Sequence, residues 1–94
     1  MYVFSVNALA GKAFDTFRKG EEVPFIVYIN FQDLFGAELL CRTYLVQEGF
    51  SAPKIDKRKL IEARYLNDPK MVDADSALKE ALKTGYSIQV FSAH

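Results

Sequence analysis

The sequence has little of what several protein classes require. A single cysteine, Cys41, occurs among its 94 residues, which excludes a disulfide within one chain and a cysteine-based zinc site. Lysine and arginine total 12, as do aspartate and glutamate, so no net charge draws the whole molecule to nucleic acid or to an anionic membrane. No run approaches the roughly 18 to 20 apolar residues of a membrane span. No secretory pattern opens the chain, and we expect a cytoplasmic protein that is neither exported nor inserted in a membrane.

What the sequence does contain is ample material for a core. Half of the residues are hydrophobic and 14% are aromatic, with 26% charged, a composition typical of a globular protein. A chain of 94 residues leaves no room for a second hydrophobic core. We therefore expect one domain over residues 1–94.

The most informative segment is a run of apolar residues between positions 23 and 31. Its pattern predicts a strand with apolar side chains on both faces, where one face carries Phe25, Val27, Ile29 and Phe31 and the other carries Ile26, Tyr28 and Asn30. A strand that is apolar on both sides usually lies inside a sheet whose two faces are covered. We expect this strand to be central.

Residues 32–48 predict a helix that is capped by Asn30 or Asp33 and ends at Gly49. A spacing of 100° per residue gives this helix a core stripe and a second, smaller apolar stripe, formed by Phe35, Leu39 and Val46. We expect the amino-terminal segment of the same chain to cover the second stripe. The alternative is a homodimer contact there.

The remaining segments predict further strands and one more helix. Residues 2–7 and 86–92 are expected as strands, and residues 74–84 as a helix that begins at Asp73 or Asp75 and ends at Gly85. An edge strand is expected to begin at residues 52–56. Residues 59–66 fit either a strand or a short helix, and we favour a strand because the overall architecture requires one.

Together these elements predict an α+β fold. The sequence Gly49-Phe50-Ser51 follows the first helix, and Gly85-Tyr86-Ser87 follows the later one, which suggests two crossover units. We expect a two-layer sandwich of ferredoxin-like or split βαβ type, with a mainly antiparallel sheet, an additional amino-terminal strand and both helices on one face. Ile26 and Tyr28 indicate that the opposite sheet face is apolar and needs a cover.

The residues that usually carry chemistry do not form a set in the sequence. His94 is the only histidine, and Cys41 falls on the core stripe of the first helix. Asp68, Asp73 and Asp75 lack the spacing of a calcium loop, and turns and helix caps explain them. We therefore expect no metal, no cofactor and no catalytic residue.

Our leading hypothesis is a non-catalytic interaction or regulatory module that acts as a homodimer or on another protein. A first alternative is a small dimeric enzyme with a pocket on the open sheet face, containing Tyr28, Asn30 and Tyr44. A second alternative is nucleic-acid association through a basic edge at residues 54–64, which includes Lys57, Arg58 and Lys59. We favour reading this edge as solvated lysines and arginine that prevent sheets from pairing end to end, so we do not expect nucleic acid or a membrane as partner.

Overall fold

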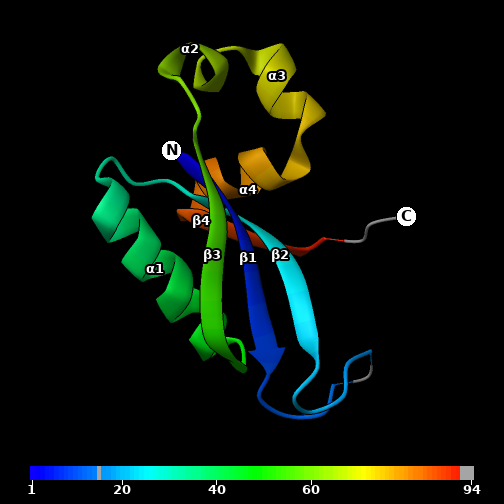
Figure 1. Ribbon diagram of the computed structural model, residues 1–94. Helices are drawn as coiled ribbons and strands as arrows, with labels where there is room; N and C mark the ends of the chain where they lie inside the picture. The colour runs from blue at the N-terminus through cyan, green and yellow to red at the C-terminus, as the bar shows by residue number, and fades with distance from the viewer. Residues whose placement is uncertain (15, 92–94) are drawn as a thin grey trace.

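The computed structural model describes residues 1–14 and 16–91. In chain order, the elements are β1 (Tyr2–Ala10), β2 (Glu22–Ile29), α1 (Leu34–Gln47), β3 (Phe50–Leu60), α2 (Ala63–Leu66), α3 (Pro69–Ala74), α4 (Ser76–Thr84) and β4 (Tyr86–Val90). Figure 1 shows α1 alongside the strands, while α2, α3 and α4 gather at one end of the sheet.

The four strands form one open sheet in the order β3-β1-β2-β4, and every neighbouring pair is antiparallel. This confirms the α+β class and the antiparallel sheet. The amino-terminal strand β1 lies inside the sheet, between β2 and β3. Because both neighbours are antiparallel to β1, β2 and β3 run in the same direction, and α1 connects them across β1.

One face of the sheet carries the main core. Strand alternation brings Phe4, Val6, Phe25, Val27 and Ile29 to this face, and all of them are nearly fully buried. Helix α1 covers them with Ala37, Cys41 and Leu45. The ring of Phe50 closes one end of this core, where it contacts Phe14, Phe17 and Phe25. Burial of each large side chain contributes roughly 1.5 to 3 kcal/mol.

Helix α4 covers the other face of the sheet, so the expectation of both helices on one face is wrong. Tyr28 pairs with Ser87 across β2 and β4, on the side opposite Val27, and its hydroxyl donates to Asp75, the N-cap of α4. Leu78 and Ala81 of α4 lie in a second cluster with Tyr28. The chain must pass from β3 at one edge to β4 at the other edge, and α1 already occupies the first face.

The uncovered part of this second face is mostly polar, which corrects the expected apolar face. The registers align Lys57, Ser5, Ile26 and Gln89 in one row across all four strands. Three of these four side chains are polar, and Ile26 is only partly exposed. The apolar residue that the sequence analysis paired with it, Tyr28, is covered by α4. The sheet itself therefore does not require a further layer here.

Residues 59–66 also differ from the strand that the sequence favoured. Strand β3 continues to Leu60, and residues 63–66 form the short helix α2. Pairing with β1 holds the lysine-rich segment in a strand conformation. Val3 aligns with Lys59, and Ile61 donates its backbone N–H to the Met1 carbonyl at 2.8 Å. Tertiary pairing thus overrides the weak strand propensity of this segment.

Candidate functional site

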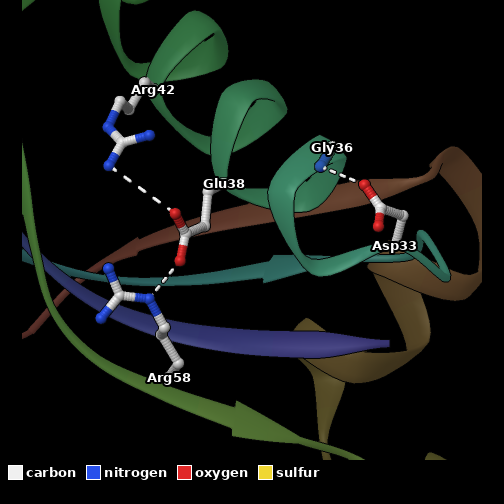
Figure 2. Close-up of polar contacts among 5 residues, drawn as sticks. All are labelled: Asp33, Gly36, Glu38, Arg42 and Arg58. Carbon is white, nitrogen blue, oxygen red and sulfur yellow. Dashed lines mark hydrogen bonds and ion pairs between the residues drawn. The ribbon is translucent and has the colours of Figure 1, made fainter.

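Helix α1 begins and ends where its sequence signals place it. The Asp33 side chain accepts a hydrogen bond from the Gly36 backbone N–H at 2.8 Å, so Asp33 rather than Asn30 is the N-cap (Figure 2). After the helix, Gly49 has a φ of 96°, in the left-handed region that glycine adopts without strain. The predicted helix over residues 32–48 is thereby confirmed to within two residues at its start.

The second apolar stripe of α1 faces away from the protein. Phe35 is 79% exposed, Leu39 63% and Val46 56%, whereas Ala37, Cys41 and Leu45 on the opposite side are buried. The expectation that the amino-terminal segment covers this stripe is wrong. That segment forms strand β1 inside the sheet, and the aromatic rings that follow it, Phe14 and Phe17, pack around Phe50.

An ion-pair cluster borders the stripe on one side. Glu38 accepts a hydrogen bond from the Arg58 Nε of β3, and its other oxygen lies 3.8 Å from the Arg42 guanidinium (Figure 2). The Glu38 side chain is only 12% exposed. The positive charges of Arg42 and Arg58 therefore compensate the Glu38 carboxylate, and the contact with Arg58 links the edge strand β3 to α1.

Near the start of α1, a further aromatic ring extends the apolar surface. The ring of Phe31, 44% exposed, lies against Gly36. Next to Leu39, the Thr43 hydroxyl donates a hydrogen bond to the Leu39 backbone carbonyl at 2.8 Å, so this hydroxyl has a partner within the helix. Monomeric proteins rarely expose contiguous apolar patches of this kind without a binding role. The stripe of Phe35, Leu39 and Val46 is therefore the candidate interaction surface.

The three basic residues of the edge do not form one site. Strand alternation directs Lys57 and Lys59 to the second face, since they pair with Ser5 and Val3 there. Arg58 points to the first face and binds Glu38. The expected grouping of these three charges is thus divided between two faces of the sheet.

The residues expected to share an enzyme pocket also lie apart. Tyr28 is on the second face, whereas Tyr44 stacks on Tyr86 against the main core, with ring centroids 3.9 Å apart. Asn30 is exposed beyond the end of β2 and donates its backbone N–H to the Gly85 carbonyl. The structure therefore does not bring Tyr28, Asn30 and Tyr44 together.

A cleft of about 640 Å³ does exist on the second face, between the sheet and the segment 61–78. Its polar centre is Tyr28, whose pKa is raised to about 12 by burial and by the hydrogen bond to Asp75. That carboxylate also accepts from the backbone N–H groups of Ala77 and Leu78 at 3.1 Å. Both groups are thus engaged in holding α4. Of its lining residues, Tyr28 was expected in a pocket on this face, whereas the other wall was not predicted because it is formed by the segment with the weakest local pattern.

The acidic residues near this cleft have structural roles. Asp68 caps α3 by accepting from the Lys70 backbone N–H, Asp75 caps α4, and Asp73 lies 3.5 Å from Lys79. The expectation that helix caps account for Asp68 and Asp75 is confirmed. Among the residues that the structure describes, no three His, Cys, Asp or Glu side chains gather in a way that could hold a metal ion. His94 lies outside the described residues.

Comparison with known proteins does not assign the chain. No protein family, no curated protein and no solved structure matches it. Within residues 1–14 and 16–91, no helix is both long and apolar enough to cross a membrane.

Proposed function

We propose that this protein is a non-catalytic protein-interaction module that pairs with a second copy of itself through α1. The observation that carries the proposal is the exposure of Phe35, Leu39 and Val46 on the side of the helix opposite the core. Burial of such side chains from water is the dominant favourable term in protein association. The two alternative functions have less support, since neither the pocket residues nor the basic residues converge.

A second copy suits this surface because the stripe is complementary to itself. If two α1 helices pack antiparallel about a two-fold axis, Phe35 of one copy lies opposite Val46 of the other. Leu39 then meets the aliphatic part of Arg42, whose charged end is directed to Glu38. An isologous contact of this kind closes after two copies, so it does not lead to filaments.

We further propose a split βαβ arrangement and a cytoplasmic location for this protein. The connection of β2, α1 and β3 around β1 supports a split βαβ arrangement. Two features depart from the ferredoxin-like pattern: α4 lies on the opposite face, and β4 is antiparallel to β3, so the second expected crossover unit is not formed. The single buried cysteine, Cys41, suits a reducing compartment such as the cytoplasm. A contact made by one 14-residue helix is small, so we expect a reversible dimer that forms at micromolar concentrations.

Sedimentation velocity over a range of concentrations tests the proposal. We expect wild-type protein to shift from monomer to dimer as its concentration rises, and the Leu39→Glu variant to remain monomeric with an unchanged circular dichroism spectrum. Gln47→Glu, on an exposed position of the same helix outside the stripe, is the matched control and should dimerise like wild type. A Leu39→Glu variant that dimerises as well as wild type would contradict the proposal.

A further inference from the structure

Strand β4 forms an edge of the sheet whose outer side is unpaired among the described residues. It pairs with β2 alone. The Asn30 backbone N–H donates to the Gly85 carbonyl and the Phe91 N–H donates to the Pro24 carbonyl, both at 2.9 Å. Because hydrogen-bonded and non-hydrogen-bonded residue pairs alternate along an antiparallel ladder, these two bonds show which residues of β4 bond to β2. The backbone groups of residues 85, 87, 89 and 91 therefore face β2, while those of residues 86, 88 and 90 point outward.

This outer side lies in a groove of about 610 Å³. Phe50 and Glu48, which follows the end of α1, form one wall, and Ala77, Glu80 and Thr84 of α4 form the other. The Thr84 hydroxyl donates to the Tyr86 carbonyl at 2.9 Å, so one outward acceptor is already satisfied. The outward backbone groups of Ile88 and Val90 have no such bond within the described part of the chain.

The two edges of the sheet differ in how they are protected. Strand β3, at the other edge, carries Pro53, Lys54, Lys57 and Lys59, and its register shifts twice against β1. Proline, lysine and irregular register are the features that keep an edge from accepting another strand. Strand β4, with the sequence Tyr-Ser-Ile-Gln-Val, has no charge and no proline. Of the two described edges, the β4 edge is therefore the one without features that oppose strand addition.

The charge around the groove indicates what the added strand carries. Among the residues that the structure describes, Glu48 and Glu80 are the only charged ones that line the groove, one on each wall. Neither takes part in a salt bridge within the ranges described. Basic side chains on an added strand would compensate both carboxylates, whereas acidic ones would be repelled.

We infer that the β4 edge binds an extended, basic segment of another protein as a fifth strand of the sheet. Main-chain hydrogen bonds to Ile88 and Val90 provide the affinity, and alternate side chains of the segment contact the two walls. Apolar side chains lie beside Ile88 and Val90, and basic ones lie near Glu48 and Glu80. This site is separate from the stripe on α1, so it does not depend on the proposed dimer.

A synthetic six-residue peptide of sequence Val-Val-Lys-Lys-Val-Val, with acetyl and amide ends, serves as the probe, because adjacent side chains of a strand point to opposite faces and its two lysines can therefore reach both walls. It is titrated into nitrogen-15-labelled Leu39→Glu protein, in which the α1 contact is removed. We expect the amide signals of Tyr86, Ile88 and Val90 to shift, and hydrogen exchange of Ile88 and Val90 to slow about tenfold or more at saturation. A peptide with glutamate in place of lysine should bind much more weakly, and one N-methylated on alternate residues should not bind.

Matched variants of the protein complete the test. Val90→Pro removes an outward N–H without touching the ladder to β2 and should abolish binding, while Val90→Thr keeps that N–H and should bind like the parent. Glu48→Gln and Glu80→Gln should each weaken binding about two- to fivefold at low salt. If Val90→Pro does not fold, the N-methylated peptide decides alone.

Three results would overturn the inference. One is equal binding of the N-methylated peptide, and another is a set of shifts centred on β3 instead of β4. The third is β4-mediated self-association of the Leu39→Glu protein that Val90→Pro abolishes, because the edge would then serve a second copy and not a foreign segment.

Discussion

Tyr28 links the sheet to the helix on its second face through one hydroxyl group. The hydroxyl donates to Asp75 at 2.9 Å, and the same carboxylate caps α4. Removing the hydroxyl in Tyr28→Phe leaves that carboxylate one donor short, and we expect the free energy of unfolding to fall by about 1 kcal/mol. Urea denaturation followed by circular dichroism measures this change. Tyr65→Phe, at an exposed position, is the control and should be nearly neutral.

The thiol of Cys41 is a core group and not a reactive one. It is fully buried, and burial raises its pKa to about 12 even though nearby Arg42 acts in the opposite direction. We expect no reaction of native protein with an aromatic disulfide reagent at neutral pH, and rapid reaction of one thiol per chain once the protein is unfolded in urea. Modification of folded protein at the rate of a free cysteine would contradict this.

The raised pKa values of Cys41 and Tyr28 also predict how the stability of the protein depends on pH. The pKa values of Cys41 and Tyr28 are raised from 9.0 and 10.0, respectively, to about 12, so folding favours the protonated form of each. Their contribution is complete below pH 9 and is lost as the pH rises towards 12. We expect the urea midpoint to fall over this interval, and to fall less steeply in Cys41→Ala. A midpoint that is constant from pH 9 to 12 would contradict the assignment.

At the scale of elements, two glycines allow the chain to pass closely at the end of the core. Gly11 donates its N–H to the Gly49 carbonyl at 2.9 Å, and a Cβ on Gly11 would lie 2.8 Å from that oxygen. Because the Gly49 oxygen belongs to the backbone, it cannot rotate away as a flexible side chain could. We expect Gly11→Ala to lower the free energy of unfolding by about 1 to 3 kcal/mol, measured by urea denaturation, while Ala13→Ser at a nearby exposed position changes it little.

Elements with a strong local pattern were predictable from the sequence. Local signals mark three elements: β2 by its apolar run, α1 by its N-cap and its two apolar stripes, and α4 by Asp75 before it and Gly85 after it. Each of these elements lies within a few residues of its expected position. The segment from Lys57 to Ala74 was not predictable, because its strand is defined by pairing with β1 and its short helices α2 and α3 by contacts with each other and of α3 with α4. No local signal indicates which face of the sheet a helix covers.

The same distinction applies to the candidate site. The stripe of Phe35, Leu39 and Val46 follows from helical spacing alone, and the sequence identified it together with the alternative that it contacts a second copy. What the sequence could not show is whether another part of the chain covers the stripe. The groove beside β4 was not foreseen, since it joins residues of β2, β3, α4 and β4 that are brought together only by the fold.

At the scale of the whole molecule, helices α2, α3 and α4 bury part of the second sheet face, and other apolar surface stays exposed. The two most exposed large apolar side chains, Phe35 and Leu39, lie on α1, and others such as Leu60, Met71 and Val90 lie elsewhere. If α1 pairs two copies, association must stabilise the folded state. We therefore expect the melting temperature of wild-type protein to rise with its concentration and that of Leu39→Glu to stay constant. Differential scanning calorimetry measures both, and a concentration-independent wild-type transition would argue against pairing.

The position of β1 between β2 and β3 has a consequence for how the chain is built. The two innermost strands, β1 and β2, precede β3 and β4 in the chain, so they are able to pair before the other two strands have been synthesised. The remaining strands then attach to the outer sides of this hairpin in order of their synthesis. Strand β4, which bears the proposed docking groove, is therefore the last of the four to be synthesised, and a partner cannot engage it before the other three strands have been made.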